Sequence, residues 1–533
     1  MSRNEQDRPY FCQQHLLCVR GHFAINRNFV LSHMDPKRIL LFLFSTLGIL
    51  LVLACIVPTN GFNVFGYTLN FPTLQKFMAY RPVESNQKAN KITNLDKLNK
   101  KMAKAEKKAL GKKHKNANLD GSGIGADTSA EAVDEEGLIK ISFGKDQEDV
   151  LDDFFAKLAS AAANKQSIRI IHYGDSQIEG DRITGYLRSR IQSKFGGFGP
   201  GMIPFYLQYP TNSYKETMTG NWKRYTTFPG YVKEVKHRRY GAMNSFARFT
   251  PVVNDSSYLK NTEVEASVTI GKSKSAYGTA QTFNRVKIYY GNCRVPVSVN
   301  VYNNDELIHT DTLKYDGGTH ALELTFTDTP ENLKYVFKGK NSPDFYCFVL
   351  DGAYGIGVDN VAMRGSSGTF VTTGDMSHLR KFYDELNPEL FIMQFGGNAA
   401  VGLKDSVMAK AQANYFESQL KGLKRLRPGC AIIVIGPSDM SKKIDGEWQT
   451  YPLLPAFISY LKQAAYRAGA GYWDIYMAMG GKNSMPTWVE KNLAGPDYTH
   501  FTPGGAKFVA EMFYEAFIFE YNKYLKKKKK EEL

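Results

Sequence analysis

The chain has 533 residues, of which 43% are hydrophobic and 23% are charged, and it contains six cysteines. These fractions are typical of globular proteins, and they exclude a wholly disordered chain, a fibrous repeat and a membrane protein with many spans. At about 150 residues per domain, the length predicts two or three domains. So few cysteines exclude a fold that depends on a framework of disulfides.

The formal net charge of +16 comes mainly from two short segments. Residues 88–115 contribute +9 and residues 523–533 contribute +4. The rest of the chain is close to neutral, so no folded part has the basic face that a nucleic-acid-binding protein needs. We therefore expect no nucleic acid among the partners.

One stretch near the N-terminus is suited to a lipid bilayer. Residues 39–57 carry no charge, and Lys37 and Arg38 precede them. Nineteen such residues are long enough to span a bilayer, and the preceding positive charges predict that the N-terminus stays in the cytoplasm while the bulk of the chain is exported. An uncleaved anchor, lipidation at Cys55 and cleavage of a signal peptide all remain open. Met34 is a candidate for the true start of translation.

Composition divides the chain into seven segments. The region before 137 is rich in Lys and then in Gly, Ser and Ala, without a sustained apolar period, and this predicts a flexible linker. The predicted segments are 1–38, a cytoplasmic or mis-annotated segment; 39–57, the anchor or signal; 58–136, a juxtamembrane segment and linker; 137–205, the first part of a core domain; 206–350, an inserted β domain; 351–525, the second part of the core; and 526–533, a Lys-rich tail.

From 137 onward, short apolar strands alternate with helical patterns. Buried strands are expected at 167–172, 389–394, 431–435 and 471–475. Helices are expected at about 177–194, 377–386, 406–426, 453–468 and 504–525. This alternation predicts an α/β domain with a parallel sheet that helices cover on both faces.

Residues 206–350 have a different pattern. They are rich in Tyr, Thr, Val and Asn, with period-2 runs at 285–290, 295–302 and 333–337 and turn signals between the runs. The pattern predicts a β-sandwich, and its position predicts that the sandwich is inserted into the α/β domain.

Two segments hold candidate residues for acyl transfer. Ser176 follows Gly174 and Asp175 at the end of the first predicted strand, where open α/β sheets bind ligands. The helix expected to follow would place the positive end of its dipole behind this serine. His500 is a candidate general base for a serine hydroxyl, and Asp497 can hold its ring in the required tautomer.

Two further segments hold candidate donors for an oxyanion. Asn398 follows Gly396 and Gly397, and its side-chain amide can donate to a negatively charged oxygen. Gly365 lies in a run of Gly and Ser, where a residue without a Cβ lets a backbone N–H approach a substrate. Gly368, three residues later, is the alternative at this position.

In this order the four segments resemble the sequence blocks of the SGNH/GDSL hydrolase superfamily. The resemblance implies a flavodoxin-like, three-layer α/β/α core, with Ser176 as nucleophile, His500 as general base and Asp497 as the orienting acid. It also implies an oxyanion hole formed by the backbone of Ser176 and Gly365 and by the side chain of Asn398. The family often has Asp after this Asn, whereas Ala399 follows it here.

The exported core with an inserted β domain is similar to bacterial peptidoglycan and polysaccharide O-acetylesterases. This implies a membrane-anchored hydrolase of ester bonds, in the periplasm or at the cell surface, that removes O-acetyl or other short acyl groups from a glycan without a cofactor or metal. Two alternatives remain open: a polysaccharide O-acetyltransferase that uses the same Ser-His-Asp site, and a non-catalytic, membrane-tethered scaffold that binds glycans.

Overall fold

The computed structural model describes residues 135–228, 232–252 and 262–532, together with a few positions nearer the N-terminus. The chain divides into two units, Met1–Gln87 and Lys88–Leu533. In the first unit, residues 42, 44–46 and 48 are helical, and β1 (Phe62–Val64) pairs antiparallel with β2 (Tyr67–Leu69). Most of the predicted anchor at 39–57 and of the linker at 58–136 lies outside the described residues. No helix in the described part of the chain is long and apolar enough to cross a bilayer.

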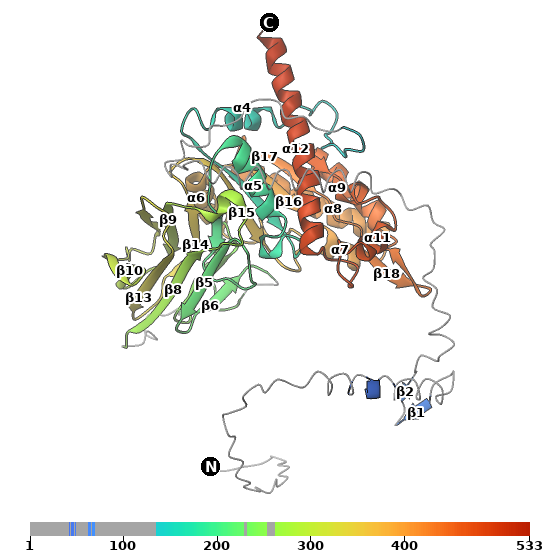
Figure 1. The fold of residues 1–533 in the computed structure, drawn as a ribbon. Helices are drawn as coiled ribbons and strands as arrows, with labels where there is room; N and C mark the ends of the chain where they lie inside the picture. Colours follow the sequence, from blue (N-terminus) through green and yellow to red (C-terminus); the bar gives the residue numbers. More distant parts are fainter. Residues whose placement is uncertain are drawn as a thin grey trace, which may run out of the picture. The chain divides into compact units, whose positions relative to one another are not determined.

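The second unit is built around a five-stranded parallel sheet with the strand order β15-β3-β16-β17-β20 (Figure 1). The predicted parallel sheet is therefore confirmed. Its strands are β3 (Ser167–Gly174), β15 (Gly355–Ala362), β16 (Pro388–Gln394), β17 (Ala431–Ile435) and β20 (Gly471–Trp473). Sequence patterning missed β15, because two glycines, Asp359 and Asn360 interrupt its apolar character.

Helices cover both faces of this sheet and make three layers. Because successive side chains of a strand point to opposite faces, Phe391 and Met393 of β16 pack with α6, α8 and α9, whereas Leu390 and Ile392 pack with α4, α5 and α12. These helices are α4 (Asp152–Ser160), α5 (Thr184–Phe195), α6 (Met376–Leu386), α8 (Ser406–Leu426), α9 (Leu454–Arg467) and α12 (Pro503–Glu531).

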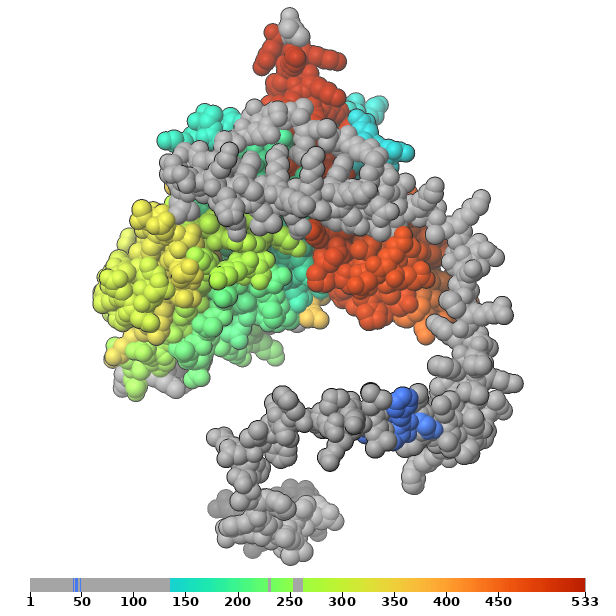
Figure 2. All heavy atoms as spheres, viewed as in Figure 1, coloured from blue at the N-terminus to red at the C-terminus, as the bar shows by residue number. Residues whose placement is uncertain are grey.

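The insertion consists of two antiparallel sheets that enclose a hydrophobic cluster of their own. The first sheet contains β11 (Glu306–Thr312), β10 (Val297–Asn303), β13 (Asn332–Gly339), β8 (Val264–Lys272) and β5 (Tyr214–Thr219). The second contains β12 (Thr319–Thr325), β9 (Arg285–Gly291), β14 (Asp344–Asp351), β7 (Ser245–Arg248) and β6 (Lys223–Thr226), and β4 (Gly201–Pro204) also pairs with β14. In Figure 2 the insertion, in green and yellow, lies on the side of this unit opposite the C-terminal part of the core, in orange and red.

Three predicted boundaries are wrong. Strand β4 belongs to a sheet of the insertion, although 201–204 was assigned to the core. The helix expected from 177 begins only at Thr184, after the short 3-10 helix η2 (Glu179–Asp181), because Gly180 and Asp181 have φ values of +67° and +63° that a right-handed helix cannot contain. Helix α12 continues to Glu531 through the predicted tail, since lysine favours helix and Lys527 pairs with Asp152 of α4.

Buried ion pairs join the core to the insertion. The guanidinium of Arg169 on β3 donates to Asp359 of β15 and to Asp351 at the end of β14, each at 2.7 Å. Arg285 of β9 donates to the same Asp351 at 2.9 Å. Burial raises the pKa of Asp359, and the charge of Arg169 opposes that rise. These pairs fix the insertion against β15, the edge strand of the sheet.

Candidate active site

Ser176 lies in a turn directly after β3. Gly174 ends the strand, and a Cβ there would approach the side chain of Ile178 to 2.8 Å, so any larger residue would have to displace that side chain. Because α5 begins only at Thr184, no α-helix starts at Ser176 and the predicted helix dipole behind the serine is absent. The side chain of Ser176 is buried, with 8% of its surface exposed.

The loop before α12 brings the three predicted catalytic residues into one hydrogen-bonded chain. The Oγ of Ser176 lies 2.8 Å from Nε2 of His500, and Nδ1 of His500 lies 2.7 Å from Oδ2 of Asp497. The other carboxylate oxygen of Asp497 accepts the backbone N–H groups of Thr499 and His500. Partial burial acts to raise the pKa of Asp497, but these hydrogen bonds outweigh it and the pKa is lowered. The carboxylate therefore stays ionised and holds Nε2 of His500 as the acceptor for the serine proton.

Gln177 and Arg182 hold the histidine loop against the serine turn, and sequence analysis did not identify either. The side chain of Gln177 donates to the carbonyl of Thr499 at 2.7 Å and accepts a hydrogen bond from the N–H of Phe501 at 3.3 Å. It therefore binds the backbone on both sides of His500. Arg182 donates to the carbonyls of Ser176 and Phe501. Both residues lie in the segment that sequence patterning assigned to a helix.

An aromatic stack supports the other side of the loop. Trp448 comes from the hairpin of β18 (Ser441–Ile444) and β19 (Glu447–Thr450), and its ring stacks on Tyr498 with the centroids 3.9 Å apart. The N–H of Ser441 also donates to the carbonyl of Tyr498 at 3.1 Å. Tyr498 has a φ of +53°, and these contacts stabilise that unusual backbone conformation between Asp497 and His500.

Asn398 lies next to the serine turn, at the start of the short helix α7 (Gly397–Val401). Its Nδ2 donates to Oδ2 of Asp175 at 3.1 Å and to the carbonyl of Ser366 at 3.0 Å. Burial raises the pKa of Asp175 to about 6, although the N–H of Gln177 and other groups oppose the rise. Asp175 therefore orients the amide that sequence analysis predicted as an oxyanion donor.

The two candidate glycines have different surroundings. The N–H of Gly368 already donates to Oγ of Ser366, and a Cβ at Gly368 would lie 2.8 Å from the rings of Phe395 and Phe416. Gly368 therefore serves packing. Gly365 has a φ of +80°, and its N–H, like that of Ser176, has no hydrogen-bond partner among the described residues.

The serine and the histidine line two cavities. The smaller, of about 70 Å³, also has Asn398 in its wall. The larger, of about 470 Å³, is lined in addition by Asp497, Tyr209 and Arg364. In the described part of the chain, no group of three His, Cys, Asp or Glu side chains has an arrangement that could hold a metal ion.

Comparison with known proteins identifies the fold. No family model matches the chain, and no curated protein matches it. Among solved structures, that of a peptidoglycan O-acetylesterase is similar, with a TM-score of 0.55 and 18% sequence identity over 72% of this chain and 99% of that chain. The chain has an SGNH/GDSL hydrolase-like fold. The fold that the sequence motifs implied is thus confirmed.

Two further solved structures show weaker likenesses. A family two carbohydrate esterase from Clostridium thermocellum has a TM-score of 0.23 and 8% identity, over 48% of this chain and 92% of that chain. An acetyl xylan esterase has a TM-score of 0.22 and 14% identity, over 30% of this chain and 81% of that chain.

Proposed function

We propose that this protein is a serine esterase that removes O-acetyl or other short acyl groups from a glycan. The observation that carries the proposal is the hydrogen-bonded chain of Ser176, His500 and Asp497 at the carboxyl edge of an SGNH-like sheet. Similarity to the structure of a peptidoglycan O-acetylesterase supports an ester of a cell-wall or surface glycan as the substrate.

In the first half of the reaction, the acyl group moves from the glycan to the enzyme. Oγ of Ser176 forms a bond to the ester carbonyl carbon while Nε2 of His500 takes the hydroxyl proton. The ester C–O bond then breaks, and the same nitrogen returns the proton to the departing sugar oxygen. Asp497 stabilises the imidazolium that forms between these two steps.

The negative charge on the carbonyl oxygen needs donors in the intermediate. The backbone N–H groups of Ser176 and Gly365 are unpartnered among the described residues. The Asn398 amide lines the cavity beside Ser176, and one of its two N–H groups, which donate to Asp175 and to the carbonyl of Ser366, must turn to the oxyanion when it forms. We assign the oxyanion hole to these three groups. Donors of this kind contribute about 2.7–4 kcal/mol each to transition-state stabilisation.

Water completes the reaction: Nε2 of His500 takes a proton from the water, and the water oxygen forms a bond to the acyl carbon. The bond between that carbon and Oγ of Ser176 then breaks, and His500 returns the proton to Oγ, which releases the carboxylic acid and restores the enzyme. A sugar hydroxyl in place of water would transfer the acyl group to a second glycan instead. The same residues serve both reactions, so the acceptor that resolves the acyl-serine distinguishes an esterase from the O-acetyltransferase alternative.

The location of the enzyme is part of the proposal. The uncharged stretch at 39–57, with Lys37 and Arg38 before it, supports a membrane anchor with the catalytic unit outside the cytoplasm. A reporter enzyme that is active only outside the cytoplasm, fused after residue 57, should be active in cells. If instead a reporter enzyme that is active only in the cytoplasm is active when fused at the same position, this placement is contradicted.

The decisive experiment follows acetate release from O-acetylated peptidoglycan by the full-length protein. Ser176→Ala should abolish release, and Ser160→Ala on α4 serves as a matched control that should not. Release that persists in Ser176→Ala refutes the proposal. If the wild type hydrolyses a small aryl acetate but releases no acetate from peptidoglycan, another glycan is indicated, and Ser176-dependent acetylation of an added oligosaccharide would indicate the transferase.

A further inference from the structure

A second large cavity, in addition to the cavity of about 470 Å³ at Ser176, lies between the core and the insertion, beside the active site. Its volume is about 740 Å³, within the range of about 300–1,000 Å³ that is usual for ligand sites. It shares four wall residues with the 470 Å³ cavity that contains Ser176 and His500, and these are Glu179, Gly180, Tyr209 and Arg364. A glycan chain whose ester group lies at Ser176 can therefore extend into this cavity.

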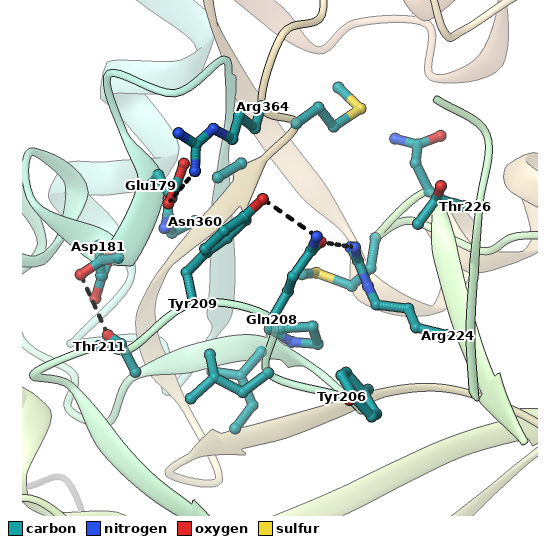
Figure 3. Close-up of a pocket in the computed structure, with 18 of the residues that line it drawn as sticks. Glu179, Asp181, Tyr206, Gln208, Tyr209, Thr211, Arg224, Thr226, Asn360 and Arg364 are labelled. Carbon is teal, nitrogen blue, oxygen red and sulfur yellow. Dashed lines mark hydrogen bonds and ion pairs between the residues drawn. The ribbon is translucent and has the colours of Figure 1, made fainter. Parts of the chain in front are cut away.

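A row of polar contacts crosses the second cavity (Figure 3). The guanidinium of Arg364 lies 5.1 Å from the ring centroid of Tyr209. Nε2 of Gln208 donates to the hydroxyl of Tyr209 at 3.2 Å, and Nη1 of Arg224 donates to Oε1 of Gln208 at 2.6 Å. The row thus leads from the wall shared with the active site to Arg224, on strand β6 of the insertion.

Arg224 differs from the other arginines of this wall. Arg364 is within 3.6 Å of Glu179, and Arg188 pairs with Asp181. Among the described residues Arg224 has no carboxylate partner, and the neutral amide of Gln208 is the acceptor it contacts. Its Nε is buried and unpartnered. Burial lowers the pKa of Arg224, as expected for a cation that lacks a counter-charge.

The wall around Arg224 also has unused hydrogen-bonding capacity. Thr227 and Asn244 line the cavity with 8% and 5% of their surfaces exposed, and Oγ1 of the first and Nδ2 of the second have no partner among the described residues. Buried polar atoms are normally satisfied, so the protein leaves polar capacity unused beside this cavity, and a small shift of either side chain would present it to a ligand. Tyr206 and Tyr209 add aromatic rings, which pack against the apolar faces of sugars.

We propose that this cavity binds a carboxylate-bearing sugar unit of the glycan, with the carboxylate at Arg224, while a neighbouring unit presents its ester to Ser176. A guanidinium edge can hold a carboxylate with two parallel hydrogen bonds, and the carboxylate is the common anionic group of acidic sugars. The inference rests on the proposed function and narrows its substrate to an acidic glycan. It assigns to the insertion a part of the substrate site rather than a separate binding role.

The test measures binding, without turnover, by titration calorimetry on the full-length Ser176→Ala protein. The probes are a short oligomer of galacturonic acid and the same oligomer after reduction of its carboxylates to hydroxymethyl groups. We expect the charged oligomer to bind about tenfold tighter or more. Equal affinities for the charged and the reduced oligomer would overturn the proposal. So would a failure of the charged oligomer to bind at millimolar concentration.

Three variants then locate the effect. Arg224→Gln should remove the preference for the charged oligomer, and Arg224→Lys should keep part of it because the charge remains. Lys215→Gln removes one positive charge from an exposed position on β5, outside the cavity, and should keep the full preference. A preference that survives in a folded Arg224→Gln protein would overturn the assignment to Arg224.

The outcomes separate this inference from the proposed function. If the charged oligomer is preferred but no ester is cleaved in a Ser176-dependent manner, the esterase proposal fails while the binding site remains. If cleavage depends on Ser176 but neither affinity nor kcat/KM depends on the carboxylate, the esterase proposal holds and the acidic-glycan site is wrong.

Discussion

Gln177 should control the catalytic rate although it contacts no substrate in the proposed mechanism. Its amide holds the carbonyl of Thr499 and the N–H of Phe501, the groups on either side of His500. Leucine has a similar volume but offers neither donor nor acceptor. Gln177→Leu should therefore free the histidine loop while leaving Ser176 and Asp497 in place.

The two hydrogen bonds set the size of the effect. Each contributes about 0.5–1.5 kcal/mol net, so together they hold the loop by roughly 1–3 kcal/mol. If losing this free energy makes the hydrogen-bonded geometry of Ser176 and His500 less populated, kcat should fall by roughly 5- to 150-fold. The KM for a small ester should change little, because the groups that contact it remain.

The assay compares kcat and KM for an aryl acetate with the thermal unfolding of each variant. Gln192 is a matched control, since it is also a buried glutamine and it donates to the carbonyls of Gly199 and Ile356, at the amino end of β15. Gln192→Leu should lower stability without a comparable loss of kcat. A kcat for Gln177→Leu within twofold of wild type, or equal losses in both variants, would refute the positioning role.

Three further changes test the site and the fold. Asp497→Asn should lower kcat by ~10³–10⁴-fold with unchanged unfolding, because the imidazole loses its acceptor at Nδ1; retention of a tenth of the activity would exclude a triad. Arg169→Met should lower the free energy of unfolding by about 3–5 kcal/mol at pH 8, because it leaves the buried carboxylates of Asp351 and Asp359 without this cation. The loss should be smaller at pH 5, because burial raises the pKa of Asp359 and favours its protonated form. A loss that does not depend on pH would contradict this. Burial raises the pKa of Glu216 to about 7 from 4.5, so this carboxyl lowers stability progressively as pH rises from about 4.5 to 7, where the unfolded chain has released the proton and the folded chain still holds it. Glu216→Gln should therefore match wild type at pH 4 and be more stable by up to about 3 kcal/mol at pH 8.5. A variant that is less stable at both pH values would show that the carboxylate is needed.

The sequence predicted the parts of the site that local motifs encode. Ser176 follows a recognisable apolar strand, and Asp497 and His500 are separated by a single loop turn, so their identities and their shared edge of the sheet could be inferred without coordinates. The apolar runs of β3, β16 and β17 were equally visible, because buried parallel strands are continuous in hydrophobicity.

Other features depend on residues far apart in the chain. β15 joins the sheet through pairing with β3, and Asp359 in its middle is compensated by residues distant in the chain, first of all by Arg169 of that strand. The late start of α5 depends on the left-handed Gly180 and Asp181, which a periodic pattern does not reveal.

By itself, then, the sequence determined the alternation of strands and helices, because that pattern depends on neighbouring residues. It also predicted an inserted β domain, from its composition, and the residues Ser176, Asp497 and His500, from short motifs and the family resemblance that they carry. Only the tertiary structure decided that Gln177 holds the histidine loop and that the N–H of Gly365, unlike that of Gly368, has no partner among the described residues. It also decided that Arg224 of the insertion faces a cavity shared with the core. The physical reason is that hydrogen bonds and ion pairs are made between side chains that folding brings together, and spacing along the chain carries no record of those contacts.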